Sequence, residues 1–190
     1  YKAIEQVPLD TYDAVLVCTP DTAKLEIVTY LLSHGKHVLV EKPLLPPGEG
    51  QIRQLGETAR STGAVCYTGY NHRFEPHIVR LKGLLGEHGL GDVYTARLFY
   101  GNGTARLVRD SSWRDAGAGV LSDLGSHLID TCKYWFGNDV DEGWEIISAN
   151  RFENSAPDHV VIALIKENFR IECEMTLLMW RNSFMCDILA

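Results

Sequence analysis

The chain has 190 residues, 45% of them apolar, and a formal net charge of −7, a globular composition that can bury a core as one large domain or two small ones. Its 18 Lys and Arg form no basic run against 25 Asp and Glu, which argues against binding to nucleic acid or to anionic membranes. No apolar run is long enough to span a membrane, and the first residues lack a signal-peptide pattern. We therefore expect a cytoplasmic location.

The first third of the chain alternates strand and helix patterns. Residues 13–20 form a continuous apolar run that suits a strand buried on both faces, and strands are also expected at 37–43 and 64–70. Apolar residues at helical spacing predict helices over 22–33 and 51–61. This β-α-β-α-β order predicts a doubly wound parallel sheet, part of an α/β fold.

The remainder of the chain has a different pattern. A helix is expected at 75–85, a strand at 91–101 and a long helix at 117–137. The strands that follow have no helices between them and lie at residues 144–151, 159–165, 169–179 and 184–189. We expect an α+β domain with a largely antiparallel open sheet, and place the domains at residues 1–72 and 73–190.

The five cysteines are odd in number, widely spaced and set among apolar neighbours, with no C-x-x-C pair. We expect all five to be reduced and to lie in the core as small hydrophobic residues. They are Cys18, Cys66, Cys132, Cys173 and Cys186.

Lys42 stands at the expected carboxyl end of a parallel strand, where ligands of such sheets bind. It is either an ordinary solvated lysine or a group that donates to a substrate hydroxyl and favours its alkoxide. Pro43 holds the backbone before it extended or across a cis bond. The other strands end at Cys18-Thr19-Pro20 and at residues 69–73, so all three ends are expected at one crevice.

Asp123 and His127 are four residues apart on the expected long helix and share a face, with Asp130 further along the same stripe. A carboxylate beside an imidazole suits a general base working near neutral pH. The alternative is an ordinary surface pair. The flanking apolar residues indicate a mostly buried helix, however, and burying polar groups there costs free energy, which favours a functional role. Metal binding is a further alternative, for which the sequence offers no additional ligand cluster.

Gly117-Ala118-Gly119 resembles half of a dinucleotide loop, but no apolar strand precedes it and the third glycine is missing. We expect it to serve a close approach of the backbone to a neighbour or a ligand.

Four motifs, VCTPDT, GKHVLVEKPL, GYNHRF and WRDAGAGVLSDLGSHLID, together resemble the glucose-fructose oxidoreductase / inositol dehydrogenase family (Gfo/Idh/MocA) over residues 13–130. The resemblance implies a Rossmann domain followed by an α/β domain whose open sheet commonly forms a homodimer or homotetramer interface. It also implies an NAD- or NADP-dependent oxidoreductase acting on a sugar, sugar-nucleotide or cyclitol hydroxyl.

By this resemblance Lys42 is the catalytic lysine of an E-K-P motif that typically carries a cis bond before its proline. His127 takes the proton of the substrate carbinol while its hydride goes to the nicotinamide, and Lys42 and Asp123 hold the hydroxyl. The implied cofactor contacts are Cys18, Thr19, Pro20, Glu41, Lys42 and Asn71. The implied substrate contacts are Arg73, Trp113, Arg114, Asp123 and His127.

Two residues depart from the family pattern: Lys24 replaces a histidine and Ala118 replaces a glycine. Neither is expected to touch the acid-base set. The chain also begins after the position of the Gly-rich loop, with roughly sixty residues absent by length comparison, and stops before the last strands, so it is expected to be a fragment. There are two alternatives to the oxidoreductase: a non-catalytic cofactor- or sugar-binding regulator, and a metal-dependent lyase or hydrolase. The presence of Lys42, Asp123 and His127 together favours the oxidoreductase over the regulator.

Overall fold

The computed structural model describes residues 1–45, 48–86 and 89–190. Its internal contacts divide the chain into an N-terminal unit, Tyr1–Tyr70, and a C-terminal unit, Asn71–Ala190. This division falls two residues before the boundary expected from the sequence. Within the described residues no helix is long and apolar enough to cross a membrane.

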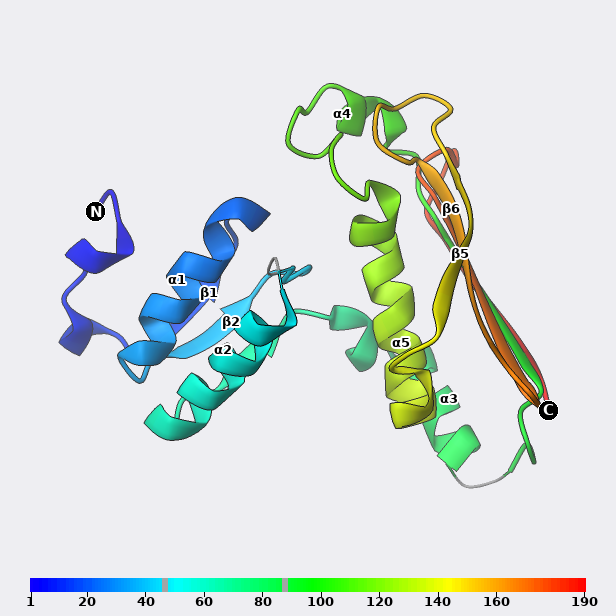
Figure 1. Ribbon diagram of the computed structural model, residues 1–190, viewed down its shortest axis with the longest axis horizontal. Coiled ribbons are helices and arrows are strands. Elements are labelled where there is room, and N and C mark those ends of the chain that lie inside the picture. Colours follow the sequence, from blue (N-terminus) through cyan, green and yellow to red (C-terminus); the bar gives the residue numbers. More distant parts are fainter. Residues whose placement is uncertain (46–47, 87–88) are drawn as a thin grey trace. The chain divides into compact units, whose positions relative to one another are not determined.

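The N-terminal unit contains a three-stranded parallel sheet in the order β1-β2-β3, with helices in both connections (Figure 1). Its elements are β1 (Ala14–Val17), α1 (Asp21–Ser33), β2 (His37–Val40), α2 (Glu49–Thr62) and β3 (Cys66–Thr68), preceded by short 3-10 turns at Ile4–Gln6 and Leu9–Thr11. The predicted β-α-β-α-β order is confirmed. Val17, Val38 and Val40 point to one face of the sheet and form a core with the apolar side chains of α1 and α2.

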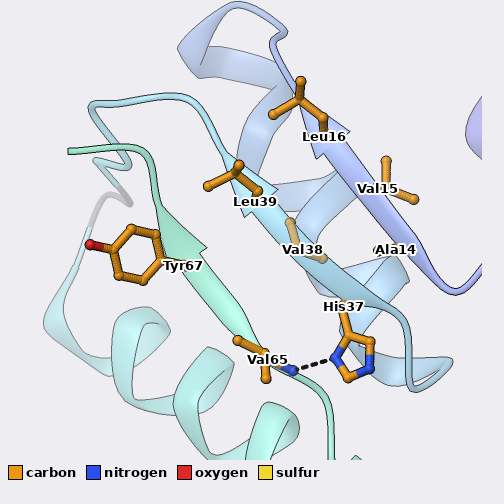
Figure 2. A pocket seen from close by; sticks show the side chains of 8 residues that line it. All are labelled: Ala14, Val15, Leu16, His37, Val38, Leu39, Val65 and Tyr67. Atoms are coloured by element: carbon orange, nitrogen blue, oxygen red, sulfur yellow. Dashed lines mark hydrogen bonds between the residues drawn. The ribbon is translucent and has the colours of Figure 1, made fainter. Parts of the chain in front are cut away.

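The opposite face of this sheet is exposed. Figure 2 looks onto it and shows a shallow apolar hollow with the two helices behind the strands. Leu16 is 64% exposed and Val65 60%, with Leu39 and Tyr67 also exposed. The expectation that the first strand is buried on both faces was therefore wrong in this structure. Both crossover helices lie on one side, so alternate strand residues face outward.

The C-terminal unit is built on a five-stranded sheet in the order β5-β6-β7-β4-β8. Its strands are β4 (Thr95–Gly101), β5 (Trp144–Asn150), β6 (His159–Lys166), β7 (Phe169–Thr176) and β8 (Ser183–Leu189). Every neighbouring pair is antiparallel except β4 and β7, which are parallel. The predicted α+β domain with a largely antiparallel open sheet is confirmed.

One face of this sheet is covered by helices, of which α5 lies along it in Figure 1. The helical elements are η3 (Asn71–Phe74), α3 (Pro76–Gly86), α4 (Ala105–Arg109), the π-helix η4 (Leu121–Gly125), α5 (Ser126–Phe136) and η5 (Gly137–Val140). Leu128 of α5 and Met175 of β7 lie in the core, and the Trp135 indole N–H donates to the Ile78 carbonyl of α3 at 3.0 Å. The sequence did not predict α4.

The long helix expected over residues 117–137 begins later and is not uniform. Residues 121–125 form a π-helix before α5 starts. Gly125 lies so close to the sheet that a Cβ there would come within 2.6 Å of Met175 Sδ. Gly119 has φ +54, and a Cβ there would be 2.2 Å from the Pro157 carbonyl oxygen. The prediction that this glycine-rich stretch serves a close backbone approach is confirmed at Gly119.

The loop between β5 and β6, which holds Pro157, is fastened by two carboxylates. Asp158 is fully buried and accepts hydrogen bonds from the backbone N–H groups of Phe152, Glu153 and Asn154. Asp115 accepts from the N–H of Ala156 at 2.7 Å and of Ser155 at 3.0 Å. These backbone hydrogen bonds lower the pKa of the Asp115 carboxyl from its ordinary value of 3.8.

The five cysteines are free thiols. Cys132 and Cys173 are buried in the C-terminal core, with their sulfur atoms 3.9 Å apart, and Cys66 is half-buried. Cys18 and Cys186 are exposed, at a strand end and on the edge strand β8, so the expectation that all five lie in the core was wrong for these two.

Candidate active site

The carboxyl ends of the parallel strands meet at one edge of the N-terminal unit. The Glu41 N–H donates to the Val17 carbonyl at 2.8 Å, and the Gly69 N–H donates to the Val40 carbonyl at 2.8 Å. The edge therefore brings two segments that contain predicted site residues, Cys18-Thr19-Pro20 and Glu41-Lys42, together with residues 69–70 at the end of the third strand.

Thr19 places a buried hydroxyl group at this edge. Its hydroxyl Oγ1 is buried, and no hydrogen-bond partner is found for it among the described residues. A buried hydroxyl without a partner is costly, and its position just after β1 makes it available to a ligand at the strand ends. Glu41 is exposed beside it, and its Oε2 would lie 3.6 Å from a Cβ placed on Gly69.

Lys42 is half-buried, and the Lys42–Pro43 peptide bond is cis, as the resemblance implied. The ammonium of Lys24, a residue of α1 that is 3% exposed, donates to the carbonyl oxygens of Lys42 at 3.3 Å and Pro43 at 2.9 Å. The expectation that Lys24 stays apart from the acid-base set was wrong. The first turn of α1 packs against the chain that follows β2, and that contact joins residues distant in sequence.

Asp123 and His127 come from consecutive parts of the helical segment in the C-terminal unit. His127, in the first turn of α5, is 6% exposed. Asp123 lies in the π-helix, one-third exposed, with its Oδ2 3.6 Å from Nη2 of Arg114. The structure thus pairs Arg114 with Asp123, two of the predicted site residues, and buries another, His127, four residues after Asp123.

Two rings that the sequence analysis did not single out lie against His127, and a third, Phe184, packs on those two. The His72 ring stacks on His127 with centroids 4.3 Å apart and planes 23° apart, and the Tyr100 ring meets His127 edge-on at 6.0 Å. Phe184 packs on both His72 and Tyr100. Burial raises the pKa of the Tyr100 phenol, and the negative charges of Asp123 and Glu75 raise it further. His72 lies inside the GYNHRF motif, which was the available signal.

Arg73 makes a bidentate ion pair with Asp130, with both N–O distances 2.7 Å. The Asp130 side chain is 10% exposed, and the guanidinium also lies 5.5 Å from the Tyr134 ring centroid. Paired forks of this kind are strong and directional, so the contact fastens η3 to α5. The expected contact of Arg73 with substrate stays a prediction.

The two remaining predicted residues are exposed. Asn71 opens η3, and Trp113 is 63% exposed in the loop before the π-helix. Over residues 1–45, 48–86 and 89–190 there is no group of three or more His, Cys, Asp or Glu side chains that could hold a metal ion.

Two family models match the chain. Residues 1–70 match one described as "Oxidoreductase family, NAD-binding Rossmann fold", and residues 78–188 match one described as "GFO/IDH/MocA C-terminal domain". The first match coincides with the N-terminal unit, and the second lies within the C-terminal unit.

Several known proteins are similar to the chain. It is 32% identical over 137 residues to trans-1,2-dihydrobenzene-1,2-diol dehydrogenase of Oryctolagus cuniculus and 29% identical over 145 residues to glucose-6-phosphate 3-dehydrogenase of Bacillus subtilis. These matches cover 72% and 73% of this chain, which spans 41% of the length of each relative.

A solved structure shares the fold. The inositol dehydrogenase homolog from Azotobacter vinelandii, complexed with NADH and myo-inositol, superposes with a TM-score of 0.78 at 20% identity. The superposition covers 96% of this chain and 49% of the other.

Proposed function

Because the chain belongs to the GFO/IDH/MocA family of oxidoreductases, we propose that its protein is an NAD(P)-dependent dehydrogenase. It moves a hydride between a CH–OH group of a sugar, sugar nucleotide or cyclitol and the nicotinamide. The names of the similar proteins support this class, since they specify a diol, a sugar phosphate and an inositol. The observation that carries the proposal is His127, a buried imidazole stacked on a second ring in the turn after Asp123.

The edge of the parallel sheet fits a nicotinamide cofactor. Its buried Thr19 hydroxyl lacks a partner among the described residues, and Cys18 and Glu41 are exposed beside it. We assign cofactor contacts to these residues and to Pro20, Lys42 and Asn71. When bound, the nicotinamide accepts the hydride of the carbinol carbon. The assignment covers NAD and NADP alike.

The chain's own residues handle the proton. His127 accepts the hydroxyl proton as the carbinol becomes a carbonyl and its hydride leaves, so one proton and one hydride balance the oxidation. The surrounding rings restrict rotation of the imidazole, which keeps the accepting nitrogen in place. Lys42 donates to the substrate oxygen and stabilises the charge that develops there, and Asp123 holds the same hydroxyl.

We assign substrate contacts to Arg73, Trp113 and Arg114, together with Asp123 and His127. Arg114 pairs with Asp123 and thereby fixes the carboxylate that holds the reacting hydroxyl. Trp113 offers an exposed indole face suited to the C–H face of a sugar ring. The ion pair of Arg73 with Asp130 holds η3, the segment that carries Arg73, against α5.

We further propose that the protein assembles as a homodimer or homotetramer through the open face of the five-stranded sheet. Ile165, Met185 and Leu189 are each about 60% exposed, and strand alternation places them opposite the helix-covered face. Light scattering of the full-length protein tests this. We expect a dimer or tetramer that Met185→Glu shifts toward monomer, and a monomeric wild type contradicts the proposal.

A substrate screen tests the enzymatic proposal. The full-length protein is given NAD⁺ or NADP⁺ with sugars, nucleotide sugars and cyclitols, and NAD(P)H formation is followed by absorbance. We expect oxidation of at least one class, with a loss of about 100-fold or more in kcat for His127→Ala and for Lys42→Ala. Binding of cofactor without turnover indicates instead a non-catalytic regulator, and unchanged turnover in both variants refutes the assigned roles.

A further inference from the structure

A buried lysine lies beside the proposed catalytic lysine in the N-terminal unit. Lys24, in the first turn of α1, is 3% exposed. Lysine is almost never this buried unless its charge is paired, because an ammonium loses its hydration inside a protein. The buried ammonium of Lys24 is therefore expected to have hydrogen-bond acceptors around it.

Three oxygen atoms surround the Lys24 ammonium. Nζ donates to Asp21 Oδ1 at 2.7 Å, to the Pro43 carbonyl at 2.9 Å and to the Lys42 carbonyl at 3.3 Å. An ammonium has three N–H donors, so these contacts use its full capacity. Two of the three acceptors are consecutive main-chain carbonyls, which means that Lys24 holds the backbone on both sides of the Lys42–Pro43 junction.

The sheet holds the chain just before Lys42. The Glu41 N–H donates to the Val17 carbonyl at 2.8 Å, which extends the pairing of β1 and β2 by one residue. Lys42 belongs to no strand, yet it lies between this ladder bond and the Lys24 contacts. Because the backbone conformation sets the direction of the Cα–Cβ bond, both contacts together fix the point from which the Lys42 side chain extends and the direction of its first bond.

We propose that Lys24 is a positioning residue for Lys42: its buried ammonium holds the carbonyls of Lys42 and Pro43 and so aims the Lys42 side chain at the substrate hydroxyl. The inference rests on the proposed function, in which Lys42 donates to that hydroxyl. Lys24 itself touches neither substrate nor cofactor. A misplacement of about 1 Å can cost on the order of 100-fold in rate, so loss of this clamp is expected to appear in kcat.

The test uses the full-length protein with a substrate identified by the screen. Lys24→Met replaces the ammonium by an apolar group of similar length. Lys36→Met is the matched control, because Lys36 Nζ donates to the Tyr12 carbonyl at 2.8 Å at the amino end of the same sheet. We expect Lys24→Met to lower kcat about 10- to 100-fold with KM changed less than about threefold, and Lys36→Met to keep kcat within about twofold.

Hydrogen exchange of the peptide covering residues 38–45 gives a readout that does not depend on activity. Faster exchange there in Lys24→Met but not in Lys36→Met supports the clamp. Unchanged exchange together with an unchanged kcat overturns it. A variant that loses stability while kcat per folded molecule stays constant also overturns it, because that result describes a purely structural lysine.

Two milder variants keep the test decisive if Lys24→Met does not fold. Lys24→Gln keeps two N–H donors without the charge, and Asp21→Asn alters an exposed partner while leaving both carbonyl contacts. We expect a larger loss of kcat in Lys24→Gln than in Asp21→Asn, and the reverse order overturns the inference.

The outcome also separates this inference from the proposed function. A wild-type protein without dehydrogenase activity removes the basis of both. An active wild type with an inactive Lys42→Met variant and a fully active Lys24→Met variant refutes the role of Lys24 alone.

Discussion

The two units hold their proposed reactive groups by different means. In the N-terminal unit, Lys42 follows a short parallel strand and is held through main-chain atoms, by a ladder bond and by a buried ammonium. In the C-terminal unit, His127 is held by side-chain rings and by a helix packed against a sheet. Variants in the first unit are therefore expected to act through the backbone, and variants in the second through packing.

The largest effect is expected at the packed histidine. His127→Asn keeps a polar side chain of moderate size but removes the proton acceptor, so we expect kcat of the full-length protein to fall about 10²- to 10⁴-fold. His34→Asn, on the exposed end of α1, is the control and should retain the wild-type rate. A His127→Asn variant that keeps more than a tenth of the wild-type kcat removes the acid-base role from this residue.

A glycine pair measures how tightly the π-helix segment is anchored. Gly119→Ala adds a Cβ 2.2 Å from the Pro157 carbonyl at positive φ, and we expect a loss of about 3 kcal/mol in the free energy of unfolding. Gly117→Ala has a similar φ but open space, so strain alone should cost about 1 kcal/mol. Denaturant unfolding measures both, and equal losses contradict the close approach.

The Arg73–Asp130 pair tests the fastening of η3 to α5. Arg73→Lys keeps the charge but loses the bidentate fork, for which we expect a cost of about 1–2 kcal/mol in the free energy of unfolding. Arg80→Lys, at an exposed site on α3, should change the stability by less than about 0.5 kcal/mol. Thermal unfolding of the two variants measures both losses, and equal losses contradict a stabilising role of the bidentate ion pair.

The smallest effect is expected at Asp115. Its folded-state pKa is lowered by the N–H groups of Ala156 and Ser155 from an ordinary value of 3.8, so it stabilises the fold above that value, and this contribution is lost as pH falls through the lower folded pKa. Asp115→Asn keeps an acceptor without a titrating group. We expect its unfolding free energy to depend less steeply on pH below about pH 4, and an identical acid limb in both proteins contradicts the assignment.

The sequence predicted the elements whose signals are local. Strands such as Trp144–Asn150 and His159–Lys166 follow from their apolar patterns, and the largely antiparallel sheet follows from the absence of helices between them. The π-helix was not predicted, and the close approach of its Gly125 to Met175 joins residues fifty apart in sequence, which local spacing does not show. Whether an apolar strand is covered on one face or two is also set by partners elsewhere, so the exposed Leu16 face was missed.

The candidate site shows the same limit. The motifs located Lys42, Asp123 and His127, because residue type and spacing are local properties. The supporting contacts were missed: Lys24 reaches the chain eighteen residues on, and His72 meets His127 only through the folded core. Such pairings depend on which segments meet after folding, which spacing along the chain does not encode.

We propose that Lys42 and His127 act on the same substrate hydroxyl. A double-mutant comparison tests it most directly: kcat is measured for the full-length wild type, for Lys42→Met, for His127→Asn and for the double variant, with one substrate and cofactor. Residues that act as one set are strongly non-additive, so we predict a double variant about as slow as the slower single variant. A double variant whose loss equals the product of the two single losses contradicts the account.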